Sequence, residues 1–96
     1  MQFMTLSRRR TEAFSDAEFA TKIDAEAERA RSLYLEGFIR QIWHRGDQGG
    51  ACLLIEADTE EQVHRTLNTL PMVAAGMLEV VAVVPLNPYR GFGPRQ

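Results

Sequence analysis

The chain has 96 residues, of which 45% are hydrophobic and 25% are charged, a composition typical of one soluble globular domain. Its net charge of −2 excludes the strong positive field of a nucleic-acid-binding protein. One cysteine and two histidines offer neither an internal disulfide nor a metal-ligand spacing, so we expect no bound metal.

The first elements are a short strand and a long helix. Met1–Leu6 is apolar and predicts a strand, followed by a loop that contains the three arginines at 8–10. Ser15 and Glu18 form a capping-box pattern at the start of a helix. Apolar residues then recur every three or four positions until Gly37, which predicts one amphipathic helix ending at that glycine.

A hairpin follows this helix. Phe38–Arg45 has the β-branched and aromatic content of a strand, and Gly46–Gly49 supplies a turn. The return strand, Ala51–Ala57, is apolar at almost every position except Glu56. Such a strand is expected to have both of its faces covered.

A second helix and a last strand complete the pattern. Either Asp58 or Thr59 caps the helix, which runs to Pro71 and leads into a loop at 72–76. Met77–Val84 is rich in valine and predicts the last strand, which is expected to end at Pro85.

The resulting order, β-α-β-β-α-β, predicts an α+β fold of the ferredoxin-like kind, with a four-stranded antiparallel sheet and both helices on one face. The third and fourth strands are apolar on both sides, so a second copy is expected to cover the other face and form a dimeric α+β barrel. We therefore predict one domain over residues 1–86. Residues 87–96 form an irregular C-terminal arm that could contact a partner subunit.

Several motifs resemble the muconolactone Δ-isomerase family. These are Gly37 followed by Gln41–Arg45, the strand Leu53–Ala57, and Val63–Leu67 running into Leu70 and Pro71. The resemblance covers residues 25–86. It implies a ferredoxin-like dimeric barrel, often assembled into larger rings, and a cofactor-free enzyme that moves a double bond in an anionic lactone of aromatic-compound breakdown.

Four residues are candidates for acid–base catalysis. An imidazole titrates near neutral pH, so His44 is the first candidate for a general base and His64 is a second. Glu56 and Glu79 are single acids in apolar strands, where burial would raise the pKa of a carboxyl. Each of the four also has a purely structural interpretation, as a surface residue, a packing residue or one half of an ion pair.

Four further residues are candidates for substrate binding. Trp43 could form the wall of a pocket or fill the core of a dimer. Arg40 and Arg45, five residues apart on one strand, should point to opposite faces, so at most one can bind a substrate carboxylate. Arg8 could attract anions to a pocket mouth. Cys52, in an apolar strand without a neighbouring base, is expected to be inert.

The sequence thus predicts a cofactor-free isomerase, working on a small unsaturated lactone inside a homodimer or a larger homo-oligomer. Two alternatives stay open: a cofactor-independent oxygenase or cyclase acting on an aromatic polyketide-like substrate, and a binding module without catalytic activity. Phosphate-binding motifs, a signal-peptide pattern and an apolar span are all absent from the sequence. We therefore expect a cytoplasmic protein with a small-molecule substrate, no nucleic-acid partner and no membrane association.

Overall fold

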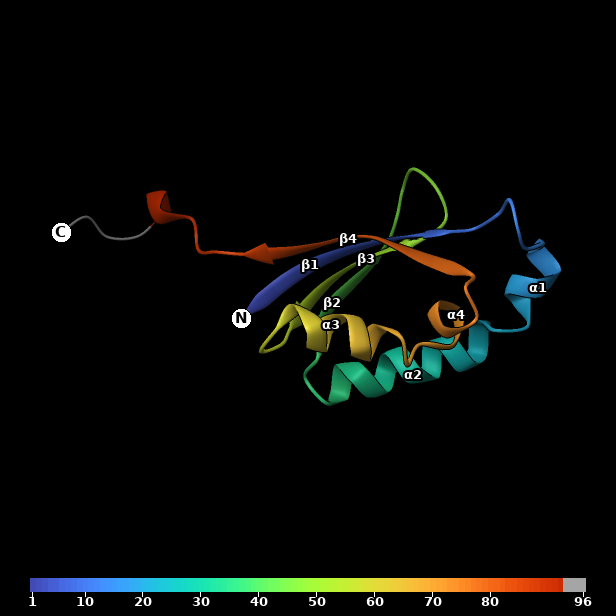
Figure 1. Cartoon of the computed structure of the whole chain (residues 1–96), viewed down its shortest axis with the longest axis horizontal. Coiled ribbons are helices and arrows are strands. Elements are labelled where there is room, and N and C mark those ends of the chain that lie inside the picture. The colour runs from blue at the N-terminus through green and yellow to red at the C-terminus, as the bar shows by residue number, and fades with distance from the viewer. Residues whose placement is uncertain (93–96) are drawn as a thin grey trace.

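A four-stranded antiparallel sheet with helices on one face forms the body of the protein in the computed structural model, which describes residues 1–92 (Figure 1). The strand order β2-β3-β1-β4 is that of a ferredoxin-like fold and confirms the predicted fold class. The elements are β1 (Gln2–Arg9), α1 (Asp16–Ala20), α2 (Ile23–Leu35), β2 (Ile39–His44), β3 (Ala51–Glu56), α3 (Glu60–Leu67), α4 (Pro71–Ala74), β4 (Leu78–Leu86) and the 3₁₀ turn η1 (Arg90–Phe92).

The long first helix of the prediction is divided into two. The capping box of Ser15 and Glu18 is present at the start of α1, as expected. After one turn, the backbone N–H groups of Thr21 and Lys22 donate to carbonyls three residues back, at 3.2 and 3.0 Å, and α1 ends. This tighter turn redirects the chain after Phe19, which is 1% exposed, and α2 then begins in a new direction.

Strands β1 and β4 are longer than the sequence pattern indicated. Arg8 and Arg9 belong to β1, where they pair with Glu79 and Leu78 of β4, and the expectation of a loop there is wrong. Pro85 lies inside β4 and does not end it. β4 is at the edge of the sheet, where a proline is tolerated because one side of the strand has no partner.

The second half of the chain differs from the prediction in small ways. Thr59 caps α3, its hydroxyl accepting a hydrogen bond from the Gln62 backbone N–H at 3.1 Å. The expected loop at 72–76 contains the short helix α4, which starts with Pro71 at a position where its missing N–H costs nothing.

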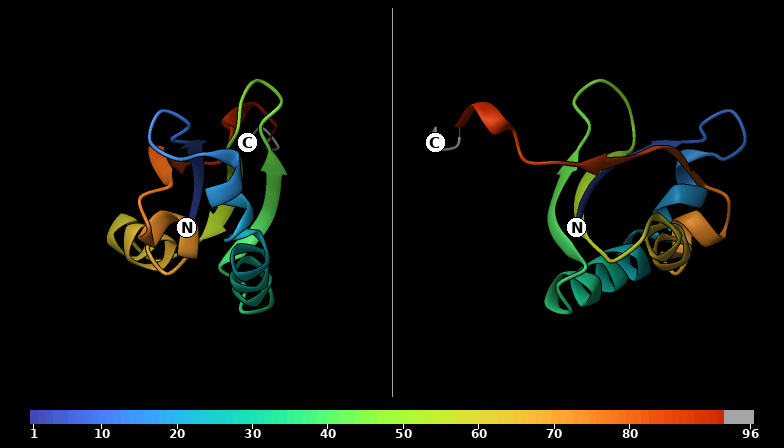
Figure 2. Two further views of the ribbon diagram at one scale, coloured as in Figure 1. Left: turned by 90° about the vertical axis from the view of Figure 1, so that its right-hand side faces the viewer. Right: turned by 60° about the vertical axis from the view of Figure 1, so that its left-hand side comes forward.

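The core lies between the helices and one face of the sheet, which we call the helix face. Phe3, Ile55 and Val63 are 2% exposed or less and join strands β1 and β3 to α3. A smaller cluster of Phe19, Met72 and Met77 packs under α1. All four α-helices lie on this side of the sheet (Figures 1 and 2).

The opposite side of the sheet, which we call the open face, is covered by no helix or strand of the described residues (Figure 2). Strand alternation places on it the apolar side chains of Met4, Leu6, Trp43, Leu54 and Val84. Trp43 and Val84 are 46% and 47% exposed. The Cys52 thiol also lies there, 3.1 Å from the sulfur of Met4.

Beyond Leu86 the chain extends away from the sheet toward η1 (Figure 1). This segment belongs to the predicted irregular arm, of which residues 93–96 lie outside the described residues. Its contact with a partner subunit stays a prediction. In the described part of the chain, no helix has the length and apolar content needed to span a membrane.

Candidate functional site

A cleft of about 490 Å³ opens between α2 and the helix face of the sheet. This volume lies in the range of about 300–1,000 Å³ that is common for small-molecule sites. Most of the lining is aliphatic, and polar groups enter it at a few positions. The polar or charged side chains in the lining are those of Thr5, Ser7, Arg9, Glu26, Arg31, Tyr34 and His44.

Glu26 is the acid in this cleft, and it has a defined position. It lies on α2, and its Oε1 atom accepts a hydrogen bond from the Met72 backbone N–H at 2.9 Å. Leu70, the N-cap residue of α4, has no polar side chain that could accept this hydrogen bond. The Glu26 carboxyl therefore caps α4 in its place. Burial raises the pKa of the Glu26 carboxyl, and the bond from Met72 acts in the opposite direction with a smaller effect.

The second oxygen of Glu26 is free for another role. Within residues 1–92, its Oε2 atom has no protein hydrogen-bond partner. A carboxylate that is partly desolvated in this way is a stronger base than one in water. The position of Glu26 therefore suits proton transfer to or from a ligand in the cleft.

His44 enters the cleft from the last position of β2. The register shift between Ile39 and Gln41 leaves Arg40 as an extra residue. Beyond this bulge the alternation puts Ile42 and His44 on the helix face and Trp43 on the open face. The bulge therefore decides which of these neighbours lines the cleft.

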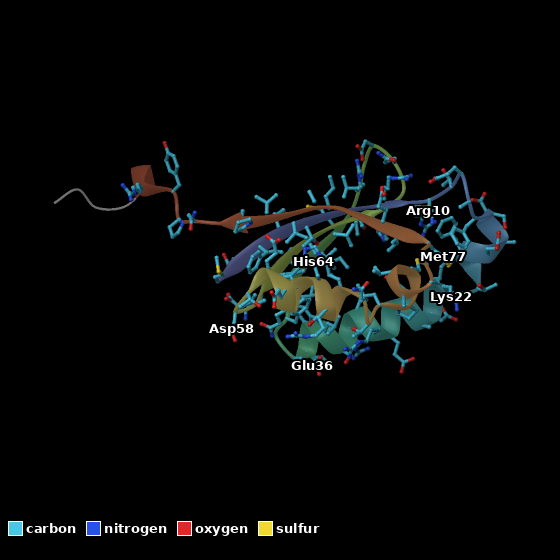
Figure 3. All side chains as sticks on the ribbon, in the orientation of Figure 1. Arg10, Lys22, Glu36, Asp58, His64 and Met77 are labelled. Atoms are coloured by element: carbon cyan, nitrogen blue, oxygen red, sulfur yellow. The ribbon has the colours of Figure 1, made fainter. Side chains whose placement is uncertain are left out.

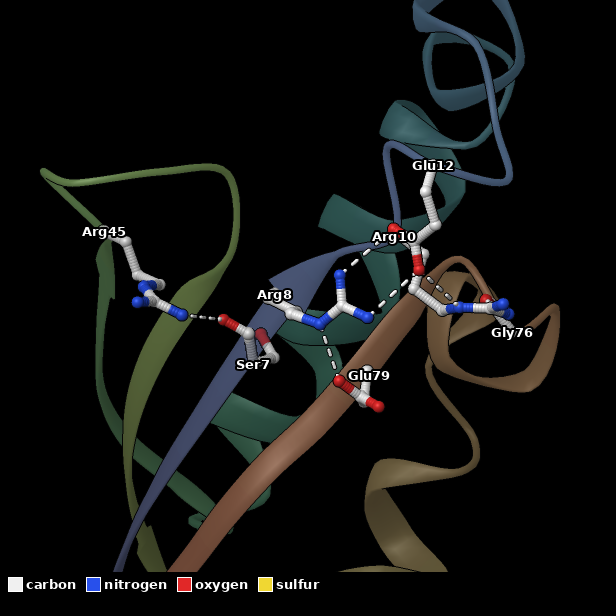
Figure 4. Close-up of polar contacts among 7 residues, drawn as sticks. All are labelled: Ser7, Arg8, Arg10, Glu12, Arg45, Gly76 and Glu79. Atoms are coloured by element: carbon white, nitrogen blue, oxygen red, sulfur yellow. Dashed lines mark hydrogen bonds and ion pairs between the residues drawn. The ribbon is translucent and has the colours of Figure 1, made fainter.

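The three consecutive arginines have three different environments. Arg8 is on the open face, where its guanidinium bonds Glu79 at 2.6 Å and Glu12 at 3.1 Å (Figure 4). Arg10 donates to the Gly76 carbonyl at 3.0 Å. Arg9 points to the helix face between them and lines the cleft. The alternation of β1 thus brings one arginine of the three to the cleft.

The other predicted substrate-binding residues lie away from the cleft lining. Arg40 is exposed at the bulge. Arg45 binds the Asp47 carboxylate at 2.7 Å. It also donates to the Ser7 carbonyl at 3.2 Å, which ties the hairpin turn to β1 (Figure 4). The expected two-face alternation of Arg40 and Arg45 does not apply, because Arg40 is the extra residue of the bulge and Arg45 follows the end of β2.

Three of the predicted catalytic residues are also outside the lining. The Glu56 and Glu79 side chains are 43% and 51% exposed, so neither has the burial that its catalytic interpretation required, and both fit the alternative of one half of an ion pair. Glu56 binds the N-terminal ammonium at 2.7 Å, and Glu79 binds Arg8. His64 lies on α3 (Figure 3), 3.7 Å from the Glu60 carboxylate, and its side chain is 52% exposed. Of the four, the structure brings His44 alone to the cleft.

Sequence reasoning missed Glu26 and Arg9. Glu26 looks like any charged residue on the outer side of an amphipathic helix, since its buried position depends on the contact with α4. One signal could have found it: Leu70 before Pro71 is a poor cap, so the helix that starts there needs an acceptor from elsewhere. Arg9 was missed because the predicted strand ended at Leu6, whereas β1 continues to Arg9.

Metal-ligand geometry is not found in the part of the chain that the structure describes. No group of three or more His, Cys, Asp or Glu residues there is arranged to hold a metal ion.

Comparisons with known proteins identify relatives of this fold. A family model described as muconolactone delta-isomerase matches residues 1–90. The chain is similar in structure to 5-chloro-2-hydroxyhydroquinone dehydrochlorinase from Burkholderia phenoliruptrix AC1100, solved in complex with 2,5-dihydroxybenzoquinone. The TM-score is 0.59 at 21% identity, over 88% of this chain and 89% of the other. No curated protein sequence matches significantly.

Proposed function

Because the chain belongs to the muconolactone delta-isomerase family, we propose that it is an enzyme that moves a proton, and with it a double bond, in a small unsaturated lactone. The substrate class is an anionic, enolisable compound from the breakdown of aromatic molecules. The observation that carries this proposal is the partly desolvated Glu26 carboxyl, which lines a mostly aliphatic cleft together with His44.

Glu26 is the proposed general base. Its Oε2 atom takes a proton from an acidic carbon of the substrate, and the electron pair of the broken C–H bond forms a dienolate. The bond from the Met72 N–H to Oε1 holds the carboxylate in place during this step. Burial favours the protonated form that results, so the product of proton abstraction is stabilised.

His44 is the proposed partner in the second half of the reaction. A proton is added to the far carbon of the conjugated system, which completes the shift of the double bond and uses up the dienolate electron pair. An imidazole can donate and recover a proton at neutral pH. The proton taken by Glu26 balances the one that His44 donates, and exchange with solvent restores both groups.

The test is proton NMR of muconolactone in heavy water, with and without the protein. Migration of the double bond with deuterium incorporation supports the proposal. Deuterium exchange without migration means that the base removes a proton from muconolactone but that the natural substrate has a different carbon skeleton. Saturable binding with unchanged muconolactone recovered, and no exchange, supports the binding module and contradicts the enzyme.

A second reaction is favoured by the aliphatic lining and the size of the cleft. Side chains such as Ile23, Ile42 and Leu67 line the cleft, and its volume of about 490 Å³ leaves room for a substrate larger than a single ring. A cofactor-independent oxygenase or cyclase would use this space for a polyketide-like aromatic compound. Oxygen uptake in the presence of such aromatics would support this reaction, and no uptake across a panel would remove it.

We also propose that two copies pair through the open face. Met4, Leu54 and Val84 lie in one row across three strands of that face, with Trp43 beside them. A contiguous apolar surface of this kind is typical of a protein–protein interface. The cleft is on the other side of the sheet, so pairing would leave it accessible from α2.

A further inference from the structure

Arg9 lines the cleft and has no acidic partner among residues 1–92. The described part of the chain gives Arg8, Arg10 and Arg45 a carboxylate each, and gives Arg9 none. Arg9 is nevertheless partly buried, at the end of β1, among the aliphatic side chains of the lining. A cation that is partly removed from water and has no counter-charge is a favourable place for an anion.

Two contacts hold this side chain in position. Its guanidinium carbon lies 5.0 Å from the centre of the Phe19 ring, a cation–π distance. Its aliphatic stem lies against the hairpin turn, where the Arg9 backbone N–H donates to the Gly49 carbonyl at 3.0 Å. A Cβ atom at Gly49 would come within 2.9 Å of Arg9 Cδ, so a larger residue there would displace the Arg9 stem.

A second arginine lines the cleft, but it lacks this support. Arg31 is exposed on α2, and no hydrogen bond, ion pair or ring contact restrains it in the described structure. An arginine that is already ordered loses less conformational entropy when it binds a ligand, and its planar fork matches a carboxylate. Arg9 is therefore the better anchor of the two.

From these contacts we infer that Arg9, backed by Phe19 and Gly49, forms a carboxylate-binding subsite that orients a flat unsaturated ligand in the cleft. The inference rests on the proposed function only in taking this cleft as the ligand site. The carboxylate of the ligand lies at the β1 end, and its unsaturated body extends along the aliphatic lining toward Glu26 and His44.

The test compares benzoate with benzamide, which have the same ring and nearly the same shape but differ in charge. Binding is followed by NMR, using the arginine Nε–Hε signals, of which that of Arg9 is identified by its loss in Arg9→Gln. Benzoate is expected to bind the natural chain at least about tenfold more tightly than benzamide, which corresponds to about 1.4 kcal/mol. Arg9→Gln abolishes this preference, Arg9→Lys keeps part of it, and Arg31→Gln keeps it.

The hairpin turn supplies a matched pair of variants. Gly49→Ala displaces the Arg9 stem and weakens benzoate binding, whereas Gly46→Ala has open space around its new methyl group and leaves binding unchanged. Thermal unfolding shows that each variant is folded. Arg9→Lys and Gly49→Ala keep the inference testable should Arg9→Gln fail to fold.

The inference is overturned if the natural chain shows no preference for benzoate, if Arg9→Gln keeps the preference, or if Arg31→Gln removes it equally. These results are independent of turnover. A benzoate preference that depends on Arg9, with no reaction of muconolactone, leaves the subsite standing and contradicts the isomerase. Turnover of muconolactone without a preference for benzoate supports the isomerase and contradicts the subsite.

Discussion

Two substitutions of Glu26 separate its role in α4 capping from its role in proton transfer. In the natural chain the Met72 N–H donates to Glu26 Oε1 at 2.9 Å. In Glu26→Gln the amide oxygen can still accept this hydrogen bond, while the ionisable group is lost. In Glu26→Ala that partly buried N–H loses its acceptor, at a cost of about 1 kcal/mol, the low end for an unsatisfied donor. For a domain of this size, about 1 kcal/mol lowers the unfolding temperature by roughly 4–8 °C.

The pH dependence of stability tests the environment of Glu26. Because burial raises the pKa of this carboxyl above the ordinary 4.5, its favourable contribution is present below that value and is lost as the pH rises through the folded pKa. Glu26→Gln has no such loss. We therefore expect its unfolding temperature to match that of the natural chain in acid and to equal or exceed it at neutral pH.

The assay is thermal unfolding at several pH values, together with the isomerase assay. Both variants are expected to lose about 10²–10⁴-fold in the proton-transfer rate, the usual contribution of a positioned general base. A Glu26→Gln protein that is less stable than the natural chain at neutral pH would show that the fold favours the charged carboxylate. Full activity in Glu26→Gln would refute its role as the base.

Three further predictions concern other parts of the molecule. His44→Ala should lower the isomerisation rate by about 10²-fold or more, whereas His64→Ala, outside the cleft lining, should leave the rate unchanged in the same assay. Leu54→Glu places a charge in the centre of the open face and should give a monomer by light scattering, and a dimer that persists would argue against pairing through this face. The hydrogen bond from Arg8 holds the pKa of Glu12 at about 2, below the usual 4.5, so stability that is present above 4.5 is lost as the pH falls toward 2. Glu12→Gln should flatten this part of the pH–stability curve, and an identical acid transition in both proteins would contradict the role of the ion pair.

The fold was predictable because its signals are local. The capping box at Ser15, the glycine turn of the hairpin and the valine-rich last strand each specify their own element, and together they give the ferredoxin-like order. The boundaries were less predictable. The length of β1 depends on its pairing with β4, and that pairing is between residues about 70 positions apart, as for Arg8 and Glu79.

The candidate site was predictable in one residue, His44. Its orientation depends on the bulge at Arg40, which shifts the alternation of β2 and has no mark in the sequence. Glu26 depends on a contact between two helices, and Arg9 depends on the extent of a strand. The apolar neighbours of Glu56 and Glu79 left open whether these acids are buried or form ion pairs, and in the structure both are exposed and bind a nearby cation.

We propose that the reaction takes place in the cleft between α2 and the helix face of the sheet, on the side opposite to the face proposed for pairing. A crystal structure of Glu26→Gln soaked with muconolactone tests this claim most directly. We expect the lactone in the cleft, with its ring between residue 26 and His44 and its carboxylate toward Arg9. A lactone bound instead on the open face, beside Trp43, would contradict the assignment of the site.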